Sequence, residues 1–344
     1  MSAVRGGAPG VGRALRFIVP TGVDDPARVS GGNVYDRRVR DGLAAHGWRV
    51  TTVEVADRAA TAAALAEAAD AGTTLVDGLV AAWAPEAISR AAVRSRVVVL
   101  AHMVAEAFAD ADPASVEGAR RALGHATRVI ATSNWTAAEL ARRGIVPEQR
   151  VTVALPGAVD GPVSRGEAGA LLCVGVVAPH KGQDILLDAL GRLGGLDWDC
   201  TIAGPLDVDA KFAGRVATRA ARLGSRVRLV GALDGAELSD AYQRSGLLVA
   251  PSRVESFGMA IADARSRGLP VIAAAVGGIP ESVAGGGALL VDADDPAALA
   301  AALERWMTDP ALRARLRAEA AATRARTPHW DTTLARIDDV LRAA

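Results

Sequence analysis

The chain has 344 residues, and its 39 lysines and arginines are balanced by 39 aspartates and glutamates, which leaves no formal net charge. Half of the residues are hydrophobic, which excludes a disordered chain, and the lack of a basic excess argues against a nucleic-acid binder. This length and apolar content predict two domains, each with its own core. Arginine supplies nearly all of the positive charge, because Lys181 and Lys211 are the only lysines.

The cysteines and the apolar segments bear on cellular location. Cys173 and Cys200 both fall in apolar, strand-like runs, which favours reduced core thiols over a disulfide scaffold. No apolar run approaches the roughly 18 residues of a transmembrane helix, and residues 1–16 contain no apolar signal segment. We therefore expect a cytoplasmic protein without a membrane span.

The first half of the chain alternates between short apolar runs and longer stretches with helical spacing. The runs are rich in valine and isoleucine, as in strands buried on both faces of a parallel sheet. They are Leu15–Val19, Val50–Val55, Thr74–Val76, Val97–Ala101 and Val129–Ala131. The helical stretches include Thr61–Ala71, Pro113–Gly124 and Trp135–Arg143. Repeated strand–helix units predict an α/β sheet with helices on both faces.

The pattern lapses at residues 155–169, where Gly, Pro and Ser indicate a linker, and then starts again. The strands expected after the linker are Ala170–Val174, Cys200–Ala203, Arg226–Val230, Leu247–Ala250 and Val271–Ala274. Helices are expected to begin near Gly182, Val208, Gly235, Ser256 and Pro296. Two such units predict two similar domains that face one cleft, with ligands bound beyond the carboxyl ends of the strands.

The C-terminal part of the chain reads as helices. Asp295-Pro296 and Asp309-Pro310 each place a capping aspartate before a proline at the first helical position. Pro328 then breaks the chain, and an apolar stripe with helical spacing follows at Trp330, Leu334, Ile337 and Leu341. Such a stripe is typical of packing rather than of function.

The strongest candidate for a functional site is the segment at residues 250–273, which reads as strand, loop, helix, turn and strand. Glu255 lies in the loop and Asp263 on the helix, which Ser256 is expected to cap. The N–H groups of residues 257–259 would then be unpaired, and such a helix start favours a phosphate or sugar oxygen. Taken singly, each of the two acids is more often a solvated surface residue.

A second candidate is the loop after the strand that ends near Gly175. It carries His180, Lys181 and Gly182 just before an amphipathic helix. A lysine in such a loop adds a positive charge to the start of the helix. A surface lysine is the usual alternative, but this chain avoids lysine almost everywhere else.

Two weaker candidates lie in the first half. Gly31 and Gly32, between the first strand and the next helix, would allow close passage of a ligand, although a tight turn explains them equally well. His102 directly follows the run Val97–Ala101, where it could hydrogen-bond a substrate, act as a base or be structural. The chain shows no dinucleotide-binding or P-loop glycine motif, no zinc-ligand spacing and no nucleophile elbow.

Taken together, these segments resemble glycosyltransferase family 4, the retaining nucleotide-sugar enzymes with the α/β GT-B fold of two Rossmann-like domains facing a cleft. The order of the motifs carries the resemblance: a di-glycine loop, a cleft histidine, a G-x-x-x-x-x-K-G segment and a P-S-x-x-E-S-F-G segment. The resemblance is most specific over residues 171–291. It implies an acceptor-binding domain at residues 1–160, a donor domain at residues 161–326, and a helix at residues 327–344 that crosses back onto the first domain.

The family pattern also implies a role for each candidate. Glu255 would bind hydroxyls of the donor sugar, and Lys181 would neutralise the diphosphate leaving group. His102 would contact the sugar near the reacting centre, so these three are the expected catalytic residues. Asp263 would hold the nucleotide ribose. The other donor-binding residues that the resemblance implies are Gly31, Gly32, Gly175, Val230, Gly231, Phe257, Gly258 and Met259.

Three positions depart from the family pattern. Asp263 stands where the family usually has a glutamate, and Met103 stands where an acid usually follows the cleft histidine. Val176 replaces an arginine that would contact the diphosphate. Either Lys181 suffices, with help from His180 or another arginine, or the donor site is weakened.

The resemblance implies transfer of a sugar from a nucleoside diphosphate to an acceptor hydroxyl, with retention at the anomeric carbon and without a metal or other cofactor. Two alternatives stay open: a GT-B-like phosphorylase or epimerase, and a nucleotide-sugar-binding protein that has lost catalysis. A soluble small acceptor is favoured over a membrane lipid, because only Arg37, Arg38 and Arg40 suggest a peripheral membrane contact. The base, the sugar, the acceptor and the oligomeric state are not defined by the sequence.

Overall fold

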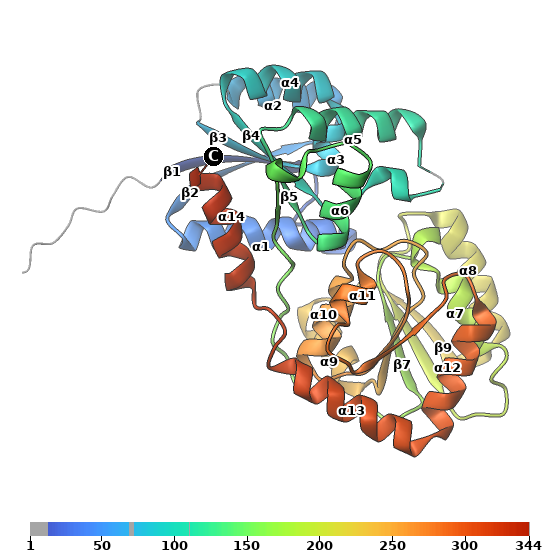
Figure 1. Cartoon of the computed structure of the whole chain (residues 1–344). Coiled ribbons are helices and arrows are strands. Elements are labelled where there is room, and N and C mark those ends of the chain that lie inside the picture. Colours follow the sequence, from blue (N-terminus) through green and yellow to red (C-terminus); the bar gives the residue numbers. More distant parts are fainter. Residues whose placement is uncertain (1–12, 69–71, 110, 344) are drawn as a thin grey trace, which may run out of the picture.

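The computed structural model describes residues 13–68, 72–109 and 111–343, which form two α/β domains, one above the other in Figure 1. Residues 1–12, most of the segment in which no signal sequence is expected, lie outside the described part of the chain. Residues 69–71, at the end of the expected helix Thr61–Ala71, lie outside it as well. Among the helices that are described, none is both long and apolar enough to cross a membrane.

The first domain is built on a six-stranded sheet in the order β2-β1-β3-β4-β5-β6, in which every pairing is parallel. Its strands are β1 (Arg13–Pro20), β2 (Trp48–Val55), β3 (Thr73–Asp77), β4 (Arg96–Ala101), β5 (Arg128–Ala131) and β6 (Val151–Val153). Its helices are α1 (Gly31–Ala45), α2 (Arg58–Glu67), α3 (Gly78–Trp83), α4 (Pro85–Arg94), α5 (Pro113–His125) and α6 (Asn134–Arg142).

The second domain repeats this plan with a sheet in the order β12-β11-β10-β7-β8-β9, again with parallel pairings. Its strands are β7 (Ala170–Val174), β8 (Asp199–Ala203), β9 (Val227–Gly231), β10 (Leu247–Ala250), β11 (Val271–Ala274) and β12 (Ala288–Val291). Its helices are α7 (Gln183–Leu190), α8 (Ala210–Arg222), α9 (Gly235–Arg244), α10 (Met259–Ser266), α11 (Ile279–Ser282), α12 (Pro296–Thr308) and α13 (Pro310–Arg324).

The central strands of both sheets are buried on both faces, as the continuous apolar runs predict, whereas the edge strands β2 and β9 contain exposed residues. In β1, Phe17 belongs to one hydrophobic cluster and Ile18 to another, because successive side chains of a strand point to opposite faces. In β7, Leu171 and Leu172 divide between two clusters in the same way. The strands are therefore covered by helices on each side, and polar groups are left for the loops at the sheet edges.

Several local predictions are confirmed. Cys173 and Cys200 are free and buried, and burial raises the pKa of the Cys173 thiol to about 12. The carboxylates of Asp295 and Asp309 each accept two backbone N–H bonds at the first turns of α12 and α13. These helices therefore begin at the prolines that the sequence marks.

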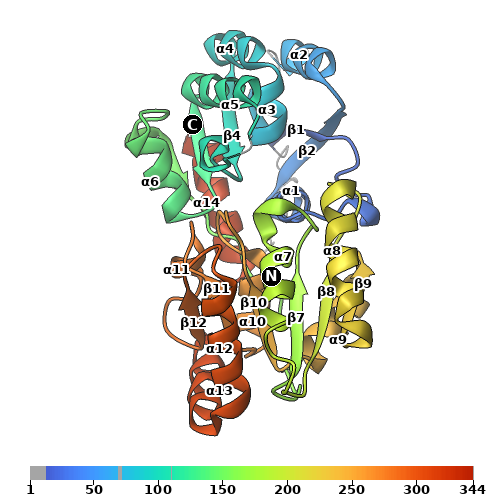
Figure 2. The same ribbon diagram turned by 90° about the vertical axis from the view of Figure 1, so that its right-hand side faces the viewer.

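The last helix, α14 (Trp330–Ala343), leaves the second domain and packs against α1 of the first (Figures 1 and 2). Ile337 is fully buried in the cluster around Phe17 and Tyr35. The approach of the two helices depends on Gly42, since a Cβ there would collide with the Leu334 side chain at 2.2 Å. The C-terminal segment is thus part of the first domain's core.

Replacing Ile337 by alanine should lower the free energy of unfolding by about 2–5 kcal/mol, because it leaves a cavity between α14 and the first sheet. Asp339→Ala is a matched control on the exposed face of the same helix and should change stability by no more than about 0.5 kcal/mol. Urea unfolding measures both. Equal stability of the two variants would show that α14 is not docked on the first domain.

Candidate active site

Three glycines end neighbouring strands of the second sheet. Gly175 follows β7, Gly204 follows β8, and Gly231 is the last residue of β9. Their φ angles are +151°, +151° and +72°, respectively. A Cβ on Gly204 would lie only 1.9 Å from the carbonyl oxygen of Gly175, so this position requires glycine. The carboxyl edge of the sheet is therefore bare backbone that a ligand can approach closely. Gly175 and Gly231 were predicted here, whereas Gly204 was not.

Lys181 and Glu255 meet at this edge. The Lys181 Nζ lies 2.5 Å from Oε2 of Glu255, and both side chains are mostly buried. The lysine stem runs beside Gly175, where an added Cβ would lie 3.6 Å from its Cδ and Cε atoms. The structure thus brings together two of the three predicted catalytic residues, as an ion pair that a bound diphosphate or sugar hydroxyl would have to rearrange.

Glycine contacts support both members of the ion pair. Gly182, after Lys181, has φ +69°, and its Cβ would collide with the Pro251 carbonyl at 2.0 Å. On the other side, a Cβ on Gly277 (φ +56°) would lie 1.8 Å from the carbonyl oxygen of Glu255. The N–H of Gly278 donates to that same oxygen at 2.9 Å. The Gly277-Gly278 turn was not among the predicted site residues, although its paired glycines were the available signal in the sequence.

The helix after Glu255 begins later than predicted. Ser256 does not cap it: α10 starts at Met259, and Gly258 takes the capping position with φ +93° and no side-chain cap bond. That left-handed conformation turns the chain into the helix only after Gly258, which is why a serine two residues earlier cannot reach the first turn. The start of α10 is consequently left without a side-chain partner, as a site for a ligand oxygen requires.

Phe257 and Asp263 lie against the linker between the domains. Phe257 is 7% exposed and packs with Ala158. Asp263 accepts a hydrogen bond from the Val159 N–H at 3.3 Å, and burial raises the pKa of its carboxyl group. No hydrogen bond of the described residues joins Asp263 to the Lys181–Glu255 pair. The ribose contact of Asp263 stays a prediction. The donor contact of Val230, which is 39% exposed near the end of β9, also stays a prediction.

The di-glycine segment forms the first turn of α1, not a loop before it. Ser30 caps this helix, because its side-chain oxygen accepts the N–H of Asn33 at 3.1 Å. A Cβ on Gly32 would lie 3.5 Å from the His102 ring, and one on Gly31 would lie 3.6 Å from Sδ of Met259 in the second domain. The start of α1 therefore touches both His102 and the start of α10, so the predicted residues of the two domains converge.

His102 is held by two acids that were not predicted from the sequence. Its Nε2 lies 2.9 Å from Oδ1 of Asp36 and 3.2 Å from Oδ2 of Asp77. Asp36 projects from α1 and Asp77 ends β3, next to the strand that His102 follows. The available signal in the sequence was Asp36, an acid five residues after Gly31 on a helix face that is otherwise apolar. The acid expected directly after His102, replaced by Met103, is thus not the one that contacts the ring.

The neighbouring basic residues His180 and Arg253 add little positive charge to that of Lys181. Burial lowers the pKa of His180 to about 4, with a further lowering by the charge of Lys181, so His180 is uncharged at neutral pH. Arg253 is engaged with Asp184 at 2.9 Å and with Asp294 at 2.8 Å. In this structure His180 therefore adds no positive charge beside Lys181, and compensation for Val176 by His180 or by another arginine stays a prediction.

Two contacts connect the domains near the site. The carboxylate of Glu281 in α11 accepts the N–H groups of Asn134 and Trp135, at 3.0 and 3.3 Å, at the start of α6. The rings of Phe108 and His180 meet edge to face with centroids 5.6 Å apart. A carboxylate is favourable at a helix start, so these contacts stabilise the two domains in the arrangement seen here.

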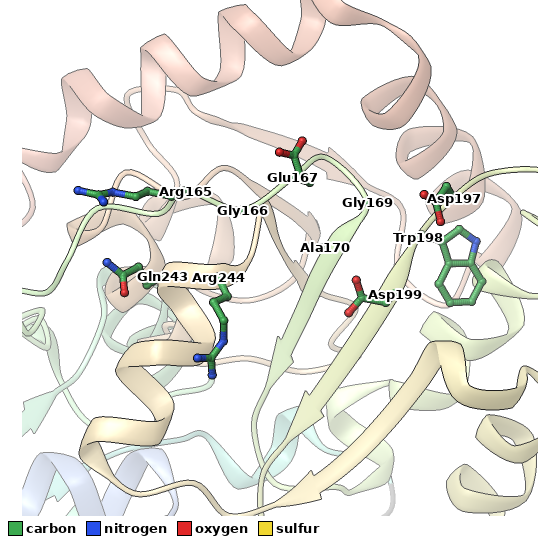
Figure 3. Close-up of a pocket in the computed structure, with 10 residues that line it drawn as sticks. All are labelled: Arg165, Gly166, Glu167, Gly169, Ala170, Asp197, Trp198, Asp199, Gln243 and Arg244. Atoms are coloured by element: carbon green, nitrogen blue, oxygen red, sulfur yellow. The ribbon is translucent and has the colours of Figure 1, made fainter.

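The hollow drawn in Figure 3 is a different feature. It has a volume of about 730 Å³ and is lined by residues that precede strands, among them Gly169 before β7 and Trp198 before β8. Ligands of parallel α/β sheets bind at the carboxyl ends of the strands. This hollow therefore lies at the opposite edge of the second sheet from Lys181 and Glu255.

Comparison with known proteins decides the family. Residues 162–323 match the family described as "Glycosyl transferases group 1". A D-inositol 3-phosphate glycosyltransferase of Catenulispora acidiphila is 34% identical over 260 residues, 68% of this chain and 61% of that protein. One from Streptomyces avermitilis is 35% identical over 257 residues, 67% of this chain and 55% of that protein. The chain belongs to the group 1 glycosyltransferases. It spans about three fifths of the length of these relatives.

Solved structures of low sequence identity show the same fold over nearly the whole chain. A sucrose-phosphate synthase from Thermosynechococcus elongatus superposes with a TM-score of 0.79 at 21% identity, covering 96% of this chain and 98% of its own. HepE from Anabaena, in complex with UDP-glucose, also gives 0.79, at 18% identity, covering 96% and 100%. The predicted GT-B fold, with its two parallel sheets, is thereby confirmed.

Proposed function

We propose that the protein transfers a sugar from a nucleoside diphosphate to a hydroxyl group of a small acceptor, with retention at the anomeric carbon. The observation that carries this proposal is the Lys181–Glu255 pair at the carboxyl edge of the second sheet. It combines a cation suited to a diphosphate with a carboxylate suited to sugar hydroxyls. In this proposal residues 161–326 bind the donor, and residues 1–160 with the helix at 327–344 bind the acceptor.

The chemistry assigned to these residues is electrostatic. As the bond from the sugar to the diphosphate breaks, negative charge develops on the leaving oxygen, and Lys181 stabilises it more strongly there than in the bound substrate. Glu255 accepts hydrogen bonds from hydroxyl groups of the donor sugar and so orients the sugar for this step. The leaving phosphate takes the proton of the acceptor hydroxyl on the same face of the sugar, so the configuration is retained. Metal independence and a cytoplasmic location remain predictions.

The names of the relatives suggest where to begin with substrates. Two of them are named for D-inositol 3-phosphate, and HepE was solved with UDP-glucose. These names favour a soluble polyol or sugar as the first class of acceptor to test, and UDP-glucose as the first donor. A lipid acceptor, which would need peripheral membrane contact, is the second class of acceptor to include.

Donor binding can be measured before the acceptor is known. In a thermal-shift series with UDP-, GDP- and ADP-sugars, one donor should raise the unfolding temperature, because a ligand of the folded state stabilises it by about 2.7 kcal/mol at a hundredfold excess over its Kd. Transfer to the acceptor panel with that donor then tests the proposal. Turnover that requires inorganic phosphate, or conversion of donor alone to its epimer, would instead support the phosphorylase or epimerase alternative. Stabilisation without any turnover would support a binding protein.

A further inference from the structure

Two buried carboxylates, Asp36 and Asp77, have no part in the reaction described above. They are 1% and 4% exposed, respectively. Removing a carboxylate from water is costly unless it is paired and hydrogen-bonded. Because Asp36 and Asp77 both contact His102, the histidine is the group that can offset the cost of burying the two carboxylates.

The hydrogen bonds around the ring define its orientation. Nε2 is the atom that faces both acids, at 2.9 and 3.2 Å. Asp77 is itself fixed, since its Oδ1 accepts the Val80 N–H at 3.0 Å at the start of α3. The ring nitrogen Nδ1 has no partner among the described residues and is not one of their fully buried polar atoms. Gly32 lies beside the Cδ2–Cγ edge of the ring, so Nδ1 is the ring nitrogen that is left free to meet a ligand.

We propose that Asp36 and Asp77 are positioning residues that hold the ring of His102 as a fixed cation and turn its Nδ1–H towards the substrate. On the proposed function, on which this inference rests, that N–H donates a hydrogen bond to the sugar near the reacting centre. An imidazolium has two donors and no acceptor. His102 therefore cannot remove the proton of the acceptor hydroxyl, which leaves that step to the departing phosphate.

The charges around the ring favour the cation. Asp36 and Tyr35 face it from α1, and Asp77 faces it from β3. Burial lowers the pKa of His102, but the charges and hydrogen bonds of the two acids outweigh it and raise the pKa to about 10. Burial raises the pKa of the Tyr35 phenol further above its usual value, so that group is neutral. The raised pKa of His102 means that the imidazolium persists from pH 6 to about 9.

Within the part of the chain that the structure describes, one carboxylate oxygen of the Asp36–Asp77–His102 cluster is left without a hydrogen bond. Oδ2 of Asp36 is fully buried and has no hydrogen-bond partner among the described residues. Burial raises the pKa of Asp36 to about 7, against the opposing charge of His102. The ring contacts Oδ1 and keeps its own proton, so a proton taken up by Asp36 itself removes the cost of this buried charge near neutral pH. A divalent cation is the rival occupant, because the three residues each offer a ligand atom and these atoms lie within 4.8 Å of one another.

Two measurements test this inference separately from the proposed function. The protonation state of His102 is read by NMR titration of protein labelled with ¹⁵N-histidine, with the His102→Gln variant used to assign its signals. In the wild type the ring should stay protonated from pH 6 to 8.5, whereas in Asp36→Asn it should lose its proton at least one pH unit earlier. Asp41→Asn, which removes an exposed acid from the same helix, should leave the titration unchanged.

The second measurement is the pH profile of kcat/KM once a donor and an acceptor are known. Asp36→Asn should move the alkaline limb of the profile to lower pH by at least one unit, while Asp41→Asn should not. A wild-type ring that titrates at its ordinary pKa would overturn the inference, and so would a bound divalent metal that Asp36→Asn removes, as measured by mass spectrometry of the purified protein. A protonated His102 in a protein that binds donors but transfers nothing would instead reject the proposed function alone.

Discussion

Alanine at Glu255 or at Lys181 should lower the rate of sugar transfer at least about tenfold, which corresponds to about 1.4 kcal/mol of transition-state stabilisation. The two side chains form one ion pair at the edge of the second sheet where we propose that the donor binds. Lys181→Ala removes the charge that opposes the developing diphosphate. Glu255→Ala removes the acceptor of the sugar hydroxyls and leaves Lys181 without its partner. Initial rates of transfer at saturating donor measure both effects.

The chain provides a matched control for the lysine. Lys211 is the only other lysine, and it is exposed on α8, so Lys211→Ala should keep the wild-type rate. Because Lys181 and Glu255 are in direct contact, the double variant should lose less than the sum of the two single losses. Unchanged turnover in both single variants would show that this edge of the sheet is not the donor site.

Gly277→Ala should abolish most of the activity although Gly277 carries no side chain. Its added Cβ would lie 1.8 Å from the carbonyl oxygen of Glu255, so the loop that carries Glu255 must shift. The left-handed conformation, with φ at +56°, adds about 1–2 kcal/mol of strain for any residue with a Cβ. We expect a loss of donor stabilisation in thermal-shift assays together with at least a tenfold fall in the rate of transfer.

Gly144→Ala separates the collision from the strain. Gly144 also has a left-handed φ, +64°, but nothing lies within 4 Å of the Cβ that it would gain. This variant should therefore lose about 1–2 kcal/mol of stability while its donor binding and rate stay at wild-type values. If both glycine variants lost activity equally, strain alone would explain the effect, and the contact with Glu255 would have no special part in the site.

The fold was predictable from local pattern because parallel strands buried on both faces leave a clear mark in the sequence. The runs Val97–Ala101 and Ala170–Val174 are β4 and β7, and the caps at Asp295 and Asp309 follow from side chains that are adjacent in sequence. The start of α10 was not predictable in this way. It depends on the left-handed Gly258, which overrides the capping preference of Ser256.

The candidate site was predictable where one loop carries the chemistry and not where distant segments combine. Lys181 and Glu255 each stand in a recognisable motif. Asp36 and Asp77 belong to no motif, because they meet His102 only after the sheet brings α1, β3 and β4 together. The support of Glu255 by Gly277 likewise depends on a contact between two loops of the second domain.

The neutral total charge conceals a local positive charge that depends on one residue. Val176 supplies none where the family has an arginine, His180 is held neutral by burial, and Arg253 is committed to two acids. Lys181 therefore carries most of the positive charge at the predicted diphosphate site. This is why its replacement is expected to have so large an effect in a chain that contains many arginines.

Retention at the anomeric carbon is the central claim, and proton NMR of the product tests it most directly. The donor that stabilises the protein is incubated with enzyme and acceptor, and the coupling constant of the anomeric proton is followed from the first turnover. An α-linked donor should give an α-linked product, because the leaving phosphate directs attack to the same face. A β-linked product at early times would contradict the account.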